Sequence, residues 1–166
     1  MNVRVCLILD NIRSAHNVGS ILRTAEGLGI EKVYLCGYTP YPKQSPDKRL
    51  PYLADKIDSR IAKTALGAEK TQDWEHNDNI HQLLVKLKAS GFVIAALEQS
   101  KTAIELSQFN PASDIALVVG NEVDGINSKL LAQCDVLLEI TMKGQKESFN
   151  VSAAAAIAMF YLKNMV

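Results

Sequence analysis

Three short polar segments each follow an apolar run, and their side chains could do chemistry together. They read NIRSAHNVGSILRTA (residues 11–25), GNEVDG (120–125) and GQKESFNVS (144–152). The first replaces the glycine-rich loop, G-x-G-x-x-G or one that ends in Gly-Lys-Ser/Thr, with which nucleotide-binding proteins cradle phosphates. The segments therefore indicate a site built from amides, a carboxylate and a guanidinium rather than from a phosphate loop.

Each of these residues also has a purely structural interpretation. Asn17, Ser148 and Asn150 belong to the residue types that cap helix N-termini. Arg23 could be an ordinary exposed arginine on a helix, and Glu122 could be a first-turn charge that complements the helix dipole. The three histidines are scattered, so no spacing predicts a metal site.

The elements that would position these segments follow from apolar spacing. Runs rich in Val, Ile and Leu predict strands over 3–9, 33–36, 92–97, 115–119 and 136–140. The runs are nearly continuous, as in parallel strands that are covered on both faces. Helical spacing predicts a helix between an Asn17 cap and a Gly29 stop, a second from Asp78 or Asn79 to Gly91, and a last one over 151–162. This order indicates an α/β protein with helices on both faces of a parallel sheet. The three polar segments then meet at the carboxyl edge of that sheet.

Length and composition bound the class of protein. The 166 residues, 48% of them hydrophobic and 22% charged, predict a single domain over residues 1–166. Cys6 and Cys36 lie in apolar runs and no C-x-x-C occurs, which favours buried thiols and a cytoplasmic location. No apolar stretch is long enough for a membrane span or a signal peptide. Because the net charge is zero, a polyanionic partner would need a local basic patch.

One such patch lies in residues 37–63, which hold four of the five prolines and six basic residues against three acidic ones. We interpret the segment as a long insertion at the edge of the sheet. Lys48, Arg49 and Lys63 are its candidates for contacts with RNA phosphates. A solvated mobile loop is the alternative.

Taken in order, the three polar segments resemble a known family. Asn17-x-Gly19-x-x-x-Arg23-Thr-Ala, Gly120-Asn-Glu122 and Ser148-Phe-Asn150-Val-Ser152 are similar to the three signature motifs of the SpoU/TrmH branch of the SPOUT RNA methyltransferases. The similarity extends over essentially the whole chain, and Phe149 departs from the leucine that is usual there. It implies a C-terminal deep trefoil knot, and methyl transfer from S-adenosylmethionine to a ribose 2′-hydroxyl of tRNA or rRNA.

The resemblance also implies roles for individual residues and no metal. The methyl donor would be held by Leu97, Gly120, Ile140, Met142 and Phe149, and the glycine would let the backbone approach the ligand closely. The catalytic set would be Asn17, Arg23, Glu122, Ser148 and Asn150.

Arg23 can grip a phosphate through two hydrogen bonds, so we expect it to fix the RNA and stabilise charge. A guanidinium, whose pKa lies above about 12, is a poor general base. His16 is one candidate for the proton acceptor, whose identity stays open.

The family further implies a homodimer in which the arginine of one chain faces the donor pocket of the other. The last helix supports this expectation, because it is apolar around nearly its whole circumference from Ala153 to Leu162. An RNA-binding protein of the same fold without transfer activity is the alternative, and a flavodoxin-type nucleotide module is a second. Substitution of Arg23, Gly120 or Asn150 by another residue type would favour the first alternative, but all three match the motifs. A phosphate-binding loop after the first strand would favour the second alternative, but the sequence has none there. The target nucleotide is not readable from the sequence.

Overall fold

The computed structural model describes residues 3–164 and contains a seven-stranded sheet. The strands lie in the order β3-β2-β1-β6-β4-β7-β5, and every neighbouring pair is parallel. Their bounds are β1 Val5–Asp10, β2 Lys32–Cys36, β3 Trp74–Asn77, β4 Val93–Leu97, β5 Ile104–Glu105, β6 Ile115–Val119 and β7 Val136–Glu139. The parallel α/β sheet expected from the apolar runs is therefore confirmed.

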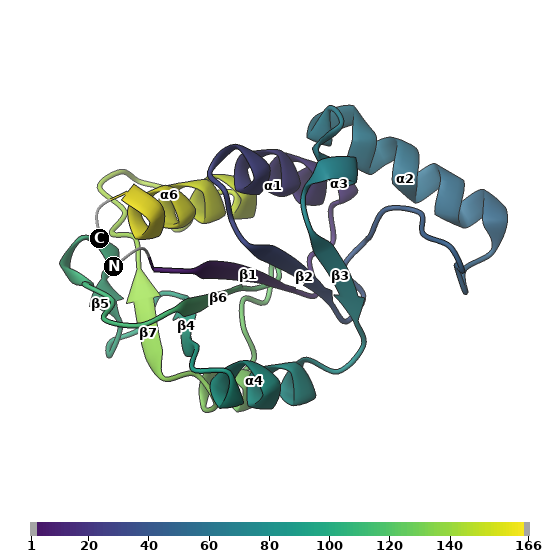
Figure 1. Ribbon diagram of the computed structural model, residues 1–166. Coiled ribbons are helices and arrows are strands. Elements are labelled where there is room, and N and C mark those ends of the chain that lie inside the picture. The colour runs from purple at the N-terminus through teal and green to yellow at the C-terminus, as the bar shows by residue number, and fades with distance from the viewer. Residues whose placement is uncertain (1–2, 165–166) are drawn as a thin grey trace.

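Helices cover both faces of this sheet, as expected (Figure 1). The helices α1, α2, α3 and α6 lie above the sheet in that view, and α4 and the short α5 pack against the opposite face. Their bounds are α1 Ala15–Gly27, α2 Pro51–Ala65, α3 Ala68–Thr71, α4 Ile80–Ala89, α5 Ser128–Leu131 and α6 Val151–Asn164, with one 3-10 turn, η1, at Leu106–Gln108.

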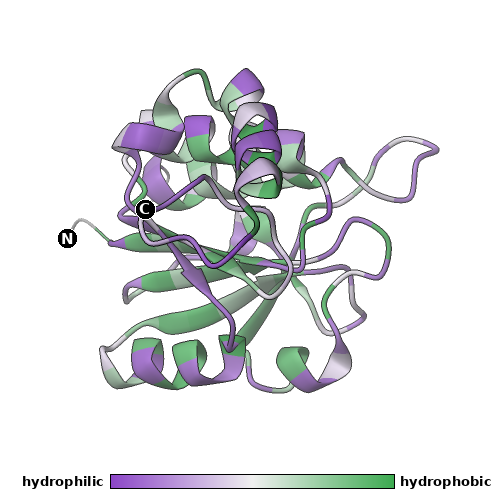
Figure 2. Cartoon of the chain, turned by 90° about the vertical axis from the view of Figure 1, so that its right-hand side faces the viewer, coloured by the Kyte–Doolittle hydropathy of each residue, from purple (hydrophilic) through white to green (hydrophobic). Residues whose placement is uncertain are grey.

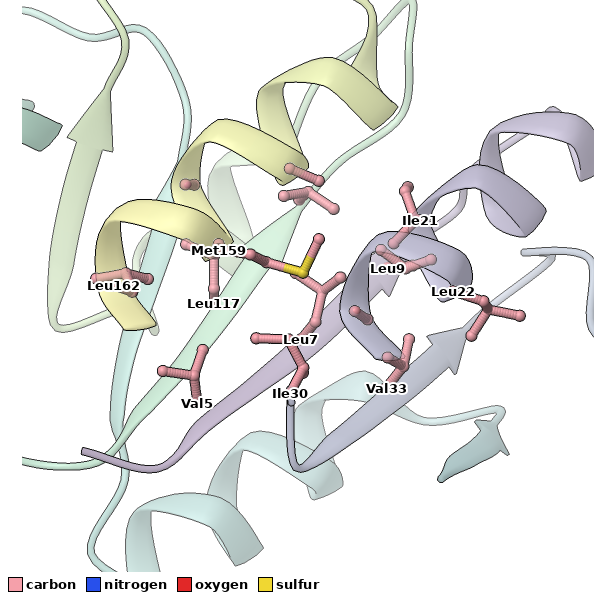
Figure 3. Close-up of a cluster of buried hydrophobic side chains, with 14 of the residues drawn as sticks. Val5, Leu7, Leu9, Ile21, Leu22, Ile30, Val33, Leu117, Met159 and Leu162 are labelled. Atoms are coloured by element: carbon pink, nitrogen blue, oxygen red, sulfur yellow. The ribbon is translucent and has the colours of Figure 1, made fainter. Parts of the chain in front are cut away.

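The alternating side chains of β1 divide the core into two halves. Leu7 and Leu9 face the side of α1 and α6, where they pack with Ile21 and Met159 (Figure 3). Ile8 belongs to the cluster on the α4 side. The central strands are hydrophobic along most of their length, whereas the edge strand β3 is hydrophilic and the helices carry hydrophilic residues on their outer sides (Figure 2). This is the pattern of central parallel strands that are buried on both faces.

Both cysteines that were expected in the core are buried free thiols. Burial raises the pKa of Cys6 to about 11 and that of Cys36 to about 12, because the interior disfavours a thiolate. These two thiols are packing groups rather than nucleophiles.

The structure confirms one of the predicted helix N-caps and corrects another. Asn79 caps α4, and its side chain accepts a hydrogen bond from the N–H of Gln82. The cap of α1, however, is Ser14, which accepts from the N–H of Asn17. Asn17 therefore lies inside the first turn, and its side chain is available for another partner.

Residues 37–63 are only partly a loop, which differs from the expected insertion. The second half forms α2, which begins with a proline at its first turn and buries only Ala54, Ile61 and Ala65. A small buried face of this kind gives a weak apolar period in the sequence. Because the segment is also rich in proline, its sequence favours a loop rather than a helix. The short strands β3 and β5 and the short helices α3 and α5 were likewise not expected.

Helix α2 crosses α1 at Gly19. A Cβ at that position would overlap the carbonyl oxygen of Ile61 and the hydroxyl of Thr64, so only glycine permits the crossing. The Thr64 hydroxyl also donates to the carbonyl of His16, at 2.8 Å. The glycine of the first polar segment thus fixes α2 against the start of α1.

Candidate active site at the carboxyl edge of the sheet

Glu122 joins the first two polar segments. Its carboxylate accepts hydrogen bonds from the backbone N–H of Arg13 at 2.9 Å and of Ser14 at 3.2 Å. The side-chain amide of Asn17 donates to the same carboxylate at 2.9 Å. The third segment joins through Asn150, whose amide donates to the side-chain oxygen of Asn17 at 3.3 Å. Residues that are more than 100 positions apart in the sequence therefore form one network.

The same contacts determine the charge state of Glu122. Partial burial acts to raise the pKa of this carboxyl, but the hydrogen bonds from Arg13, Asn17 and Ser14 outweigh it, and the pKa lies below its usual range. Glu122 is therefore ionised at neutral pH. It lies in the turn between β6 and α5, so the interpretation of this residue as a first-turn helix charge is wrong.

Asn150 has two roles at once. Its side-chain oxygen accepts from the N–H of Ser152 at 2.9 Å and so caps the start of α6, while its amide nitrogen contacts Asn17. Asn150 can therefore be a helix cap and a member of the site network at the same time. A capping residue that also reaches a second segment holds the loop before α6 against α1.

The turn that carries Glu122 is tightly folded. A Cβ on Gly120 would lie 2.7 Å from the carbonyl carbon of Gly125, so the chain's own turn already requires glycine there. Asn121, which is buried, accepts from the N–H groups of Val123 and Asp124, at 2.8 and 3.1 Å. Asn121 did not appear among the sequence candidates. A polar residue two positions after a buried strand and between two candidates is the signal that could have found it.

A cavity of about 400 Å³ lies beside this turn. Four of the five expected donor-binding residues line it, namely Leu97, Gly120, Ile140 and Phe149, and Ser148 lines it as well. Met142 is not among the lining residues, although it lies on the same loop. Apolar walls and a glycine at the turn suit the flat faces of a heteroaromatic ring.

The charge of the cavity is one-sided. Glu98, Glu122, Glu139 and Glu147 line it, and no lysine or arginine is among its lining residues in the described part of the chain. The carboxylate of Glu98 is fixed by the N–H of Ile126 at 2.9 Å. Such a lining favours a ligand that carries positive charge.

Arg23 and His16 lie on α1, and both are exposed. Within residues 3–164, no acidic side chain forms an ion pair with Arg23. Neither residue is among those that line the cavity. The guanidinium therefore points to solvent, with its donors available to an anion.

The three other basic candidates differ from one another. Lys48 and Lys63 are exposed. The guanidinium of Arg49 is bound within its own loop, by the carboxylate of Asp47 at 2.6 Å and the carbonyl of Tyr41 at 2.8 Å. It also stacks 3.6 Å from the centre of the Tyr41 ring. In this conformation Arg49 fastens a loop and has few donors left for a phosphate.

No group of three or more histidine, cysteine, aspartate or glutamate side chains within residues 3–164 is arranged to hold a metal ion. None of the helices in that range is long and apolar enough to span a bilayer.

Comparisons with known proteins give a family model and relatives that match most of the chain. The model of the SpoU rRNA Methylase family matches residues 4–160. The 23S rRNA (guanosine-2′-O-)-methyltransferase RlmB of Neisseria meningitidis is 32% identical over 153 residues, which are 92% of this chain and 55% of that protein. The chain spans about half the length of the curated relatives that it matches.

Solved structures with the same fold include two informative cases. An AdoMet-bound rRNA methyltransferase from Sinorhizobium meliloti superposes with a TM-score of 0.82 at 19% identity, over all of this chain and 58% of that one. The TrmH/SpoU tRNA modifying enzyme of A. aeolicus gives a TM-score of 0.78 at 25% identity, over 96% of this chain and 73% of that one. Because the family model matches residues 4–160 of the 166, the chain belongs to the SpoU rRNA methylase family.

Proposed function

We propose that this protein is a ribose 2′-O-methyltransferase of tRNA or rRNA that uses S-adenosylmethionine and acts in the cytoplasm. The observation that carries the proposal is the network of Asn17, Glu122 and Asn150 beside a cavity of about 400 Å³. Family membership supports the reaction class. The name of the Neisseria relative supports the 2′-hydroxyl as acceptor, and the AdoMet-bound neighbour supports the donor.

The cavity suits the donor by shape and by charge. Leu97, Ile140 and Phe149 would hold the adenine, and the turn at Gly120 brings backbone groups to the ligand. The carboxylates that line the cavity complement a sulfonium cation. When it is bound, S-adenosylmethionine supplies the electrophilic methyl group.

The residues of this chain would prepare the acceptor. Arg23, exposed and unpaired in the described part of the chain, would clamp the phosphate next to the target ribose through two hydrogen bonds. Glu122 and Asn150 hold Asn17, which together with Ser148 would orient the ribose. The proton of the 2′-hydroxyl needs an acceptor, and His16 on the first turn of α1 stays a candidate.

The basic outer face of α2 would meet the RNA backbone. Lys56, Arg60 and Lys63 are exposed and fall on one side of this helix at a spacing of four and three residues. The acidic Asp55 is engaged by the ammonium of Lys43 at 2.6 Å. Lys48 would add a phosphate contact, whereas Arg49 is left out of the proposed RNA-contacting set.

A second copy of the chain would complete the site. Ile157 and Phe160 on α6 are 41% and 56% exposed, and they border an apolar groove of about 700 Å³ that also includes Leu28, the residue that follows α1. A homodimer through this face would bury them and bring Arg23 of each copy toward the cavity of the other. The trefoil knot, in which the C-terminal segment would thread a loop, belongs to the same proposal.

The test of the reaction uses the purified full-length protein, labelled S-adenosylmethionine and total RNA. Label recovered in 2′-O-methylated nucleosides after digestion would support the proposal. Binding of both ligands without any transfer would favour the alternative, an RNA-binding protein that has kept only the fold. Arg23→Ala is expected to lower transfer by at least 100-fold at unchanged donor affinity.

Sharing of the site is tested by co-expressing two inactive variants, Arg23→Ala and Ala154→Phe. Ala154 lines the cavity from α6, so a phenylalanine there would fill the donor pocket without disturbing the turn at Gly120. If sites form between subunits, each mixed dimer has one intact site, and random pairing restores about a quarter of wild-type activity. Background activity in confirmed mixed dimers would refute the shared site.

A further inference from the structure

One exposed aromatic ring at the edge of the active site is held in place by the chain. Tyr38, which follows β2, is 62% exposed. Its hydroxyl accepts a hydrogen bond from the side-chain amide of Asn121 at 2.5 Å, and its backbone N–H donates to the side chain of Asn11 at 3.1 Å. The same amide of Asn121 donates to the backbone carbonyl of Asn11 at 3.0 Å. The side chain of Tyr38 thus reaches from the end of β2, across the end of β1, to the turn after β6.

The backbone beneath the ring is also fixed. Asn11 has a φ of 56°, an uncommon conformation for a residue other than glycine. Its side chain lies so close to Gly37 that a Cβ there would overlap it. Thr39 is buried, and its hydroxyl donates to the carbonyl of Leu9 while accepting from the N–H of Ile12, both at 3.0 Å. The segment around Tyr38 is therefore tied to the end of β1 by several bonds.

A ring that is fixed and exposed is suited to bind another flat group. Tyr52, on the outside of α2, is 69% exposed, but no hydrogen bond to its hydroxyl is found among residues 3–164. An anchored ring loses little conformational entropy on binding, whereas a free one loses more. Unpaired nucleobases stack on such rings regardless of their sequence, because every base has a π face.

We propose that Tyr38 is a stacking subsite for an unpaired base of the RNA next to the methylated ribose. The inference rests on the proposed function, because it needs an RNA strand at this edge of the sheet. Its location supports it: Asn121, which holds the hydroxyl, lines the cavity and directly precedes Glu122. The contact provides affinity for an unstacked nucleotide beyond what phosphate contacts supply.

The experiment compares two strands of equal charge with the full-length protein in the presence of S-adenosylmethionine. One is hexauridylate, and the other is a hexamer of the same ribose-phosphate backbone without bases. We expect the wild-type protein to bind hexauridylate about tenfold more tightly, a difference of about 1.4 kcal/mol. Tyr38→Leu should abolish this preference, whereas Tyr38→Phe, which keeps the ring but loses the anchor of its hydroxyl, should retain part of it. Donor affinity should be equal in all three proteins.

Tyr52→Leu is the matched control, and it should leave the preference for bases unchanged. If Tyr38→Phe and Tyr38→Leu lose the preference for bases equally, the hydroxyl of Tyr38 acts only by holding the loop in place, and the stacking subsite is overturned. Normal preference in Tyr38→Leu, in a protein that still transfers methyl groups, would overturn the subsite but leave the proposed function standing. If the preference for bases depends on Tyr38 but the protein does not transfer methyl groups, the result would support the subsite and reject the proposed enzymatic function.

Discussion

The loops after β2 and after β7 are both polar and both lie at the carboxyl edge of the sheet, yet they are built in opposite ways. In residues 37–50, Arg49 is bound to Asp47 and to two backbone carbonyls, and Lys43 is bound to Asp55. The Arg49 guanidinium holds the pKa of Asp47 far below its usual range, because it is hydrogen-bonded to that carboxylate. Most of the charges of this loop are therefore paired, either within the loop or with α2.

Residues 141–150 are nearly all exposed, by contrast, and have few contacts with the rest of the chain. The carbonyl of Glu147 accepts from the amide of Gln99 at 2.8 Å, and Asn150 contacts Asn17. No ion pair involves Lys143 or Lys146 in the described part of the chain. The difference teaches that a charged loop is a candidate for ligand contact only where its charged side chains are not already bound by other groups of the protein. By this criterion the loop before α6 is a functional loop and much of the loop after β2 is a structural one.

The largest expected effect comes from breaking the loop after β7 where it meets the site. Asn150→Asp keeps the cap of α6, because aspartate caps as well as asparagine, but it replaces the amide that contacts Asn17 by a carboxylate close to Glu122. We expect methyl transfer to fall by roughly 100-fold at a nearly unchanged melting temperature. Gln145→Ala, which removes an exposed, uncharged side chain of the same loop, should have full activity. An active Asn150→Asp protein would contradict the role of the network.

A smaller effect, on stability alone, is expected in the loop after β2. Arg49→Ala removes the guanidinium that donates to the carboxylate of Asp47 and to two backbone carbonyls, and should lower the free energy of unfolding by about 1–3 kcal/mol. Chemical denaturation of the variant and of the wild-type protein measures this difference in the free energy of unfolding. The matched variant is Lys63→Ala, which should leave stability unchanged and reduce the slope of log affinity for RNA against log salt by about 0.7–0.9. The opposite assignment of these two outcomes would mean that the loop after β2 contacts RNA through Arg49 and that α2 does not contact it through Lys63.

The smallest effect concerns acid stability. Because the pKa of Glu122 is lowered in the folded protein, its ionised form contributes stability that is fully present above the ordinary glutamate pKa of about 4.3. That stability is lost as the pH falls through the lower folded pKa. Glu122→Gln should lower the melting temperature by about 1–3 °C at pH 7, and the difference from wild type should shrink toward pH 3. A constant difference across this range would mean that the charge of Glu122 is not what stabilises the fold.

Much of the framework could be read from the sequence because it depends on local patterns. Continuous apolar runs gave five strands of the sheet, and the asparagine before Ile80 marked the start of α4. The helix α2 escaped detection because Ala54, Ile61 and Ala65 make a buried face too small for a clear period. The strands β3 and β5 are short and lie at the two ends of the sheet, where little of a strand needs to be apolar.

For the site, the sequence by itself determined which residue types stand at the ends of which strands, and hence the family. It could not decide which of those residues have partners, since hydrogen bonds between positions more than 100 residues apart depend on the packing of whole elements. Only the tertiary structure decided that Arg49 is bound inside its loop while Arg23 is exposed, although both are arginines in polar stretches. It also decided that Tyr38, one of five tyrosines, is the one that Asn121 holds at the edge of the site.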